Sequence, residues 1–312
     1  MAHTVWVGDC LDKLRSMEDE TVDCCVTSPP YYGLRNYGGK GRWWGGVRNC
    51  EHQKGDIITH QRRSNDKGSA GRKQTTNKGS GSRDTPSEHT HCIKCGAWFG
   101  QLGLEPSPED FVSNLVEIFR EVRRVLKPQG TFWLNIGDTY WGGKGKSGMK
   151  DSKLQAQRTN SLNKAHHNET DIVWAKPNPM PESVRDRCGR AHEYIFLLSK
   201  SKKYYFDSKA IKEPTTDGQG LRTKRDVWNI TNKPFKGAHF ATYPPDLVEP
   251  CILAGCPPEG VVLDPFAGSG TTGAVAEYLG RDSIQIELMP DYAKLIPKRI
   301  EDVKRYFDNR KV

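Results

Sequence analysis

Short apolar runs alternate along most of the chain with stretches whose apolar residues recur every three or four positions. The runs predict buried strands at 21–28, 130–138, 170–176, 192–200, 260–266 and 282–288. Helical spacing predicts helices at 108–130, 271–280 and 290–308, the first beginning at Ser107-Pro108 and stopping at Pro128 and Gly130. Strands that alternate with helices are typical of an α/β domain.

Two polar stretches interrupt this pattern. Residues 54–90 hold almost no large apolar side chain, so they bury too little surface to offset the entropy lost on ordering, and we expect a mobile loop. Residues 142–170 are similarly polar and show no helical stripe. The organisation predicted is one main domain, 1–49 with 96–312, that carries an inserted loop at 50–95.

Composition narrows the class of protein. The 312 residues are enough for one large domain, and a net charge of +9 with a pI near 9.0 favours a polyanionic partner. No apolar run is long enough to cross a membrane, and the first residues lack a secretion signal. Nine scattered cysteines fit reduced thiols better than a disulfide framework. We therefore expect a soluble, cytoplasmic protein with no membrane partner.

The most informative local motif is VVLDPFAGSGTTG at 261–273, where a strand leads through a glycine-rich turn into a helix. Gly268, Gly270 and Gly273 satisfy the spacing G-x-G-x-x-G, which alone is a weak sign of a dinucleotide site and leaves an NAD-dependent oxidoreductase as one reading. The residues predicted to bind a cofactor here are Asp264, Pro265, Phe266, Gly268, Gly270, Thr271 and Thr272.

The acidic residues around this turn favour another cofactor. Asp264 would repel a pyrophosphate but suits an amino group, and Glu287 ends the next strand, where it can hold ribose hydroxyls. A nucleoside with a cationic amino acid tail and no phosphate fits both carboxylates. S-adenosylmethionine is such a molecule.

A second motif, Thr27-Ser28-Pro29-Pro30-Tyr31, leaves the strand at 21–28. Alone it could be a rigid strand exit. Paired with a methyl donor it gains a mechanism, because methylating an exocyclic amino group requires two acceptors for its N–H bonds. The Ser28 hydroxyl and the Pro29 carbonyl can be those acceptors, and Pro30 restricts Pro29 to extended conformations. Tyr31 can stack on a base flipped out of the duplex.

With these two motifs the chain resembles the amino-methylating DNA methyltransferases, in the permuted group whose catalytic motif precedes the cofactor motif. VTSPPYYGLRNYG, VVLDPFAGSGTTG, VWVGDCLDKL at 5–14 and ATYPPDLVEPCILAGC at 241–256 carry the resemblance. It implies a Rossmann-like methyltransferase sheet with helices on both faces, S-adenosylmethionine as cofactor, contact of Asp9 with its adenine, and double-stranded DNA as partner, with a cognate restriction endonuclease possible.

The resemblance leaves alternatives for the target. Serine at the first motif position usually accompanies N4-cytosine in this family, which favours cytosine over N6-adenine. Members usually carry an amphipathic helix in the interval that is 139–170 here, where no apolar face is seen. A DNA-binding protein of the same fold with weak catalysis is therefore a further reading. A covalent C5 mechanism fits poorly, since Pro-Cys occurs only at Pro250-Cys251.

Four residues flanking the polar loop predict a metal site: Cys50, His52, Cys92 and Cys95. The second pair has a common zinc-knuckle spacing, whereas the first is unusual, so unconnected thiols are the alternative. His89 or His91 could replace His52. With four protein ligands the zinc would be structural.

Basic residues predict where DNA phosphates bind. The candidates are Arg222, Lys224, Arg225, Lys233 and Lys236, within a target-recognition segment predicted at 202–240, and Arg62, Arg63, Arg72 and Lys73 in the loop.

Overall fold

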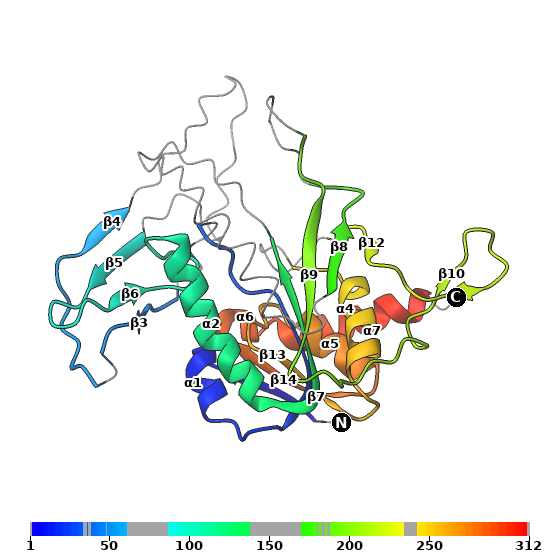
Figure 1. The fold of residues 1–312 in the computed structure, drawn as a ribbon, viewed down its shortest axis with the longest axis horizontal. Helices are drawn as coiled ribbons and strands as arrows, with labels where there is room; N and C mark the ends of the chain where they lie inside the picture. The colour runs from blue at the N-terminus through cyan, green and yellow to red at the C-terminus, as the bar shows by residue number, and fades with distance from the viewer. Residues whose placement is uncertain are drawn as a thin grey trace. The chain divides into compact units, whose positions relative to one another are not determined.

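The computed structural model describes residues 2–33, 36, 39–47, 49–60, 87–137, 170–179, 181, 185, 188–233 and 242–310. They form two compact units (Figure 1). The first comprises Met1–Pro29 and Val122–Val312, and the second comprises Pro30–Glu121. The boundary at Pro29 divides the S-P-P-Y motif, so that Ser28 and Pro29 belong to the first unit and Pro30 and Tyr31 to the second.

An eight-stranded sheet organises the first unit. Its strands, in spatial order, are β1 (His3–Val7), β14 (Asp282–Glu287), β13 (Val261–Asp264), β2 (Val22–Thr27), β7 (Leu126–Ile136), β9 (His192–Ser199), β8 (Thr170–Ala175) and β12 (Val227–Asn229). Strand β9 is antiparallel to β7 and β8, whereas every other neighbouring pair is parallel. The predicted α/β class is confirmed.

Helices α4 (Pro245–Gly255), α5 (Thr271–Tyr278) and α7 (Ile296–Arg310) gather together beside this sheet (Figure 1). Helix α5 contacts both α4 and α7 and packs on β13 and β14. The apolar cluster beneath them includes Trp133, Ile252, Val275 and Phe307. Helix α1 (Cys10–Arg15) contacts β14, and the short helix α6 (Pro290–Ala293) contacts β1 and β14. Residues 271–276 are buried on every side of α5, which holds the glycine-rich turn before it in place.

Helix α2 (Pro108–Val125) begins as predicted but ends early. The hydroxyl of Ser107 accepts a hydrogen bond from the Asp110 N–H at 3.1 Å, which caps the first turn. Residues 126–130 already belong to β7, and Pro128 and Gly130 lie in the strand. The pairing of β2 with β7 shifts register between Val22 and Cys24, and a proline without an N–H is tolerated at such an irregularity.

The predicted helix at 290–308 is two helices, α6 and α7. Pro297 lies in the first turn of α7, where its missing N–H removes no helical bond, so it favours a new start there. Helix α4 was not predicted from spacing, since Pro245 and Pro250 interrupt the sequence pattern expected of a helix.

The second unit contains a small antiparallel sheet, in the order β3 (Arg42–Trp44), β6 (Trp98–Gly100), β5 (Ser87–His91) and β4 (Ile58–His60). Strands β4 and β5 pair across both ends of the stretch predicted as a loop at 54–90, so the structure differs from the prediction there. The remainder of that loop, 61–86, lies outside the described residues, as do residues 138–169, where the sequence pattern predicted no helix. Among the described residues, no helix is long and apolar enough to span a membrane.

Candidate active site

The predicted site residues come from the carboxyl ends of four neighbouring parallel strands, β1, β14, β13 and β2. Asp9 follows β1, Glu287 ends β14, Asp264 ends β13, and Ser28 follows β2. Parallel strands present their carboxyl ends at one edge of a sheet, where α/β proteins bind ligands. The fold thus brings together motifs that lie more than two hundred residues apart in sequence.

The glycine-rich turn after β13 uses its glycines in two ways. Gly268 and Gly270 have φ values of +54° and +86°, which L side chains rarely adopt. A Cβ on Gly268 would meet nothing within 4 Å, so the turn is open at that point. A Cβ on Gly273 would lie 2.0 Å from the Gln285 Nε2, so the third glycine allows α5 to pack against β14. The first two glycines therefore shape the turn, and the third seats its helix.

Glu287 closes the other side of this turn. Its carboxylate accepts hydrogen bonds from the Gly268 N–H at 2.7 Å and from the Met289 N–H at 2.9 Å. Only 7% of the residue is exposed, and this burial raises the pKa of Glu287 to about 7, with the nearby Asp264 carboxyl adding to the rise. A carboxyl group poised near neutrality thus faces the turn.

Asp264 is fully buried and is an internal acceptor. It receives hydrogen bonds from the Thr27 hydroxyl at 2.6 Å, the Tyr243 hydroxyl at 3.0 Å and the Phe266 N–H at 3.0 Å. Burial raises the pKa of this carboxyl, and the hydrogen bonds oppose the rise. Asp264 therefore ties the residue before Ser28 to the glycine-rich turn.

The two threonines that open α5 also direct their hydroxyls into the protein. The Thr272 hydroxyl donates to the Val26 carbonyl at 3.2 Å and contacts the Tyr243 hydroxyl. The Thr271 hydroxyl accepts hydrogen bonds from the buried Arg299 side chain at 3.1 and 3.2 Å. At Thr271 and Thr272 the groups that can bind a ligand are therefore those of the backbone.

Thr27 and Tyr243 are members of the site that sequence reasoning did not single out. Tyr243 lies within the motif at 241–256, and Thr27 directly precedes Ser28 in the S-P-P-Y motif. Nothing in their spacing pointed to a shared carboxylate, because the contact depends on β2 and β13 being neighbours. A small cavity beside them is lined by Val26, Thr27, Trp133, Asn135, Ile195, Tyr243, Leu247, Val248 and Cys251.

The S-P-P-Y motif leaves β2 with Pro29 buried and with Ser28, Pro30 and Tyr31 partly exposed. In the second unit, the Gly33 N–H donates to the Gly103 carbonyl at 2.7 Å, and a Cβ on Gly103 would lie 3.1 Å from the Tyr31 carbonyl oxygen. The loop around Gly103 therefore supports the chain that follows Tyr31. Asp9 caps α1, where it accepts from the N–H groups of Leu11 at 2.9 Å and Asp12 at 3.3 Å.

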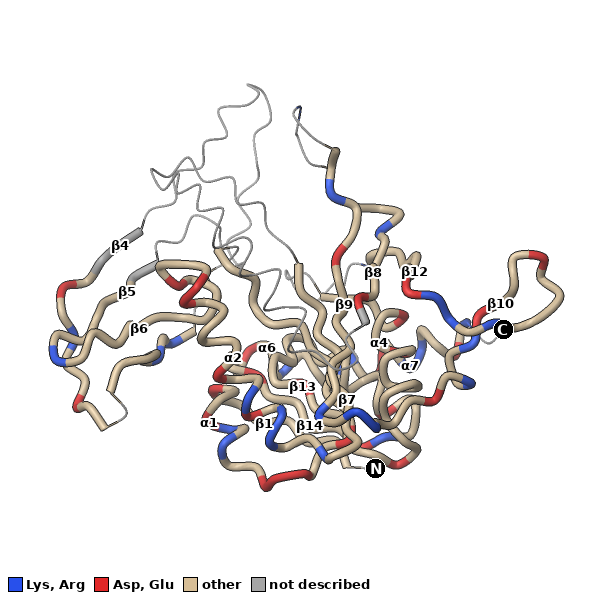
Figure 2. Tube along the Cα trace, in the orientation of Figure 1, with Lys and Arg blue, Asp and Glu red and all other residues tan. Residues whose placement is uncertain are grey.

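The basic candidates for DNA contact are mostly paired within the first unit. Lys and Arg residues follow the chain between β10 (Glu213–Pro214) and β12 (Figure 2). Arg222 and Arg225 both donate to one oxygen of Glu213, at 3.0 and 2.9 Å, and Lys224 lies over the Trp228 ring. An arginine has five N–H donors, so this pairing still leaves donors for a phosphate.

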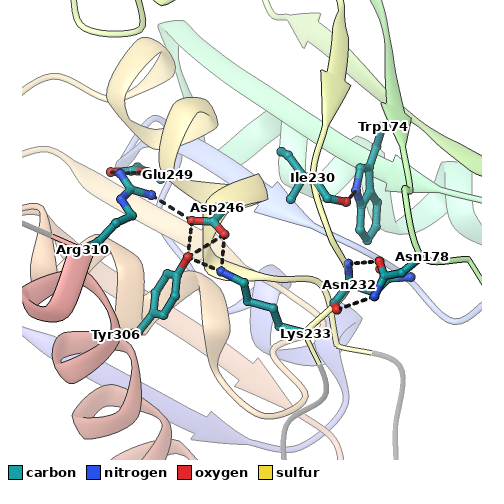
Figure 3. Close-up of polar contacts among 9 residues, drawn as sticks. All are labelled: Trp174, Asn178, Ile230, Asn232, Lys233, Asp246, Glu249, Tyr306 and Arg310. Atoms are coloured by element: carbon teal, nitrogen blue, oxygen red, sulfur yellow. Dashed lines mark hydrogen bonds and ion pairs between the residues drawn. The ribbon is translucent and has the colours of Figure 1, made fainter.

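Lys233 belongs to a second cluster of charges (Figure 3). It donates to Asp246 at 2.8 Å and contacts the Tyr306 hydroxyl, while Arg310 joins Asp246 to Glu249. This cluster attaches residue 233 to α4 and α7. The Lys233 ammonium group is therefore engaged in contacts within the protein and not with a DNA phosphate. Lys236, Arg62, Arg63, Arg72 and Lys73 lie outside the described residues.

The segment before Lys233 is held to the end of β8. The Trp174 indole donates to the Ile230 carbonyl at 2.8 Å, and Asn178 and Asn232 exchange two hydrogen bonds of 3.1 and 2.8 Å (Figure 3). Residues 230–233 are therefore positioned at the same sheet edge as the strand ends, farther along the sheet.

The predicted metal ligands come together in the second unit. One ligand atom from each of Cys50, His52, Cys92 and Cys95 lies within 4.8 Å of all the others. His89 and His91 lie outside this group.

The chain matches the family model of DNA methylases of the N6/N4 type over residues 22–298. It is 37% identical to the type II methyltransferase M.SmaI of Serratia marcescens, with 94% of this chain and 89% of that protein covered. It is 36% identical to M.Cfr9I of Citrobacter freundii over 96% of this chain and 87% of that protein.

Solved structures share the fold. The cytosine-N4-specific PvuII DNA methyltransferase matches with a TM-score of 0.59 and 19% identity over 96% of this chain and 86% of its own. The M1.HpyAVI–SAM complex matches with a TM-score of 0.52 and 17% identity over 95% and 98%. The family match over most of the chain confirms the resemblance seen in the motifs: the chain belongs to the N6/N4 family of DNA methylases and is a DNA methyltransferase.

Proposed function

We propose that the chain transfers the methyl group of S-adenosylmethionine to the exocyclic N4 amino group of cytosine in double-stranded DNA. One observation carries this proposal: β2 and β13 are neighbours, and the Thr27–Asp264 hydrogen bond joins the residue before Ser28 to the glycine-rich turn. A methyl donor in the turn and an amino group at Ser28 would therefore lie at adjacent strand ends.

The turn and its carboxylates suit S-adenosylmethionine. The backbone is open at Gly268, and Glu287 beside it can accept hydrogen bonds from ribose hydroxyls. Asp9 is assigned to the adenine end, and Pro265 and Phe266 to apolar contact. Asp264 acts through position, because its oxygens are occupied by Thr27, Tyr243 and Phe266. The SAM complex of a structural neighbour supports this choice of cofactor.

The S-P-P-Y motif supplies the acceptors. The Ser28 hydroxyl and the Pro29 carbonyl take the two N–H bonds of the target amino group and direct its lone pair at the methyl carbon. The nitrogen–carbon bond would form as the carbon–sulfur bond of the sulfonium breaks and leaves a thioether, and the methylated nitrogen would then lose one proton to solvent. Tyr31 stacks on the flipped base. No covalent bond to the enzyme is needed.

The base is assigned from Ser28, which in the family usually accompanies cytosine. We expect mass spectrometry of nucleosides from methylated DNA to show N4-methylcytosine. N6-methyladenine would establish the alternative target and leave the rest of the proposal standing. Cofactor binding without transfer of label to DNA of mixed sequence would instead favour a DNA-binding protein with weak catalysis.

We further expect the affinity for S-adenosylmethionine to depend on pH through Glu287. The raised pKa, about 7, means that the carboxyl is mostly protonated at pH 6 and mostly ionised at pH 8. Ribose hydroxyls donate to the ionised form, so affinity should fall about tenfold from pH 8 to pH 6. Titration calorimetry at the two pH values measures this.

Glu287→Gln is the control, since it keeps an acceptor but cannot ionise, and it should flatten the dependence. An equal slope in the variant would contradict the role of Glu287. The free energy of unfolding of the cofactor-free protein should change in the opposite direction and fall as pH rises. A carboxyl with a raised pKa contributes stability that is present below the unfolded pKa of 4.5 and is lost as pH rises through about 7.

DNA is held, in this proposal, by the target-recognition segment at 202–240 and its arginines, Arg222 and Arg225. Relatives named type II methyltransferases support a role in restriction–modification, with a cognate endonuclease as the proposed partner. The place of action in this proposal is the cytoplasm.

A further inference from the structure

We propose that Cys50, His52, Cys92 and Cys95 bind one structural zinc ion within the second unit. The site includes none of the residues assigned to methyl transfer. Its metal would have a structural role, whereas the methyl transfer proposed for this chain uses an organic methyl donor. Four features of the cluster carry the inference.

The first feature is the spacing of the ligand atoms. The Sγ atoms of Cys50 and Cys92 are 3.9 Å apart, and the Cys95 Sγ lies 3.4 Å from the His52 Nδ1. A tetrahedral zinc with usual bond lengths separates two sulfurs by about 3.8 Å and a sulfur from a nitrogen by about 3.5 Å. Both measured distances agree with that tetrahedron. A disulfide, by contrast, requires sulfurs about 2.05 Å apart.

The second feature is the backbone around the cysteines. The Gln53 N–H points at the Cys92 Sγ, 3.4 Å away. Backbone donors aimed at sulfur stabilise thiolates, which are the form that binds metal.

The third feature is the pair of tight turns that carry the ligands. The Cys92 N–H donates to the Ala97 carbonyl at 2.7 Å, and the Gly96 N–H donates to the Cys92 carbonyl at 2.8 Å, with Gly96 at φ +74°. Across from this turn Gly46 has φ +73°, and a Cβ there would lie 2.9 Å from the Cys95 Sγ. Glycine lets the first ligand segment approach the second closely.

The fourth feature is the donor set. Three sulfurs and one imidazole nitrogen are soft to borderline ligands, which favour zinc over magnesium or calcium. Four protein ligands complete a tetrahedral shell, so the ion would be structural. The His52 ring also stacks on Trp43 of β3, with centroids 4.7 Å apart, which fixes the ring plane.

The ion would join the segment after β3 to the hairpin formed by β5 and β6. Without it, these parts are linked by the backbone bonds of Gly55 to His91 at 3.0 Å and of Ile93 to Gln53 at 3.1 Å. Strands β3 and β6 have three residues each, and so short a sheet buries little apolar surface. A metal supplies the free energy that such a core lacks.

Metal analysis of the purified full-length chain by inductively coupled plasma mass spectrometry tests the proposal. We expect about one equivalent of zinc per chain. Cys95→Ser should lose the zinc and lower the melting temperature, whereas Cys188→Ser, an exposed cysteine outside the cluster, should keep both values of the wild type. Zinc retained in full by Cys95→Ser would overturn the assignment.

Cobalt substitution keeps the test decisive if Cys95→Ser does not fold. Wild-type protein stripped of metal should bind one equivalent of Co²⁺ and develop the visible absorption of tetrahedral, thiolate-ligated cobalt, and zinc should displace it. Wild-type protein with no bound metal and no cobalt absorption would overturn the site, and stoichiometric iron would overturn the choice of zinc. Because metal content and absorption are read without DNA or methyl donor, failure of the methyl-transfer proposal leaves this result intact.

Discussion

Replacing Ser28 by alanine is expected to lower the turnover of methyl transfer by about 100-fold while the affinity for S-adenosylmethionine changes less than about twofold. The hydroxyl is one of two acceptors that shape the amino nitrogen in the transition state, and removing one such group typically has an effect of this size. The cofactor turn is held by Asp264 and Glu287, which the substitution leaves unchanged. Single-turnover kinetics and titration calorimetry measure the two quantities separately.

Ser113→Ala is the matched control, since Ser113 is exposed on helix α2 and lies outside the residues assigned to catalysis, cofactor binding and DNA binding. It should retain the wild-type turnover and cofactor affinity. If Ser28→Ala weakened cofactor binding as much as turnover, the serine would belong to the cofactor site or to the stability of the fold. An unchanged turnover would remove Ser28 from the mechanism altogether.

Asp264→Ala is expected to weaken cofactor binding and to lower the free energy of unfolding by about 3 kcal/mol or more. The substitution leaves the hydroxyls of Thr27 and Tyr243 and the Phe266 N–H without their acceptor in a fully buried place. Each buried polar group left unsatisfied costs about 1–3 kcal/mol. Urea unfolding and calorimetry with S-adenosylmethionine measure both effects.

Asp264→Asn separates charge from hydrogen bonding. It keeps one acceptor oxygen, and the two hydroxyls can rotate to suit an amide, so we expect a smaller loss of stability than with alanine. Asp291→Ala is the surface control, because the Asp291 side chain is 81% exposed and its ion pair with Lys294 contributes little. A stability of Asp264→Ala equal to that of the wild type would show that the buried network is not needed for the turn.

The sequence predicted six of the eight strands of the main sheet, all except β1 and β12, because their apolar runs are local signals. It also predicted that two distant motifs form one site, because the residues of each motif are adjacent in sequence. Alternating apolar runs marked β2, β13 and β14, and the turn chemistry of Gly268 and Gly270 marked the cofactor segment. The structure confirmed the α/β class on this basis. The roles of the individual site residues stay predictions.

What the sequence did not predict depends on contacts between segments distant in the chain. Tyr243 joins the site only because the chain before α4 passes over the end of β13. Strand β7 begins at Leu126 because β2 pairs with it, although Pro128 and Gly130 read locally as a helix stop. Strands β4 and β5 carry little apolar signal, and their pairing in register shows only in three dimensions.

The sheet order has a consequence for how the enzyme comes into being during synthesis. Strand β1 pairs with β14 and β2 pairs with β13, so each of these early strands waits for a partner translated more than two hundred residues later. Closing so long a loop defers these contacts until β13 and β14 have been synthesised. A ribosome-bound chain that has released Ser28 but not Glu287 holds an acceptor site and no place for the methyl donor. Methylating activity should therefore appear only after β14 has left the ribosome, and products truncated before β13 should carry none.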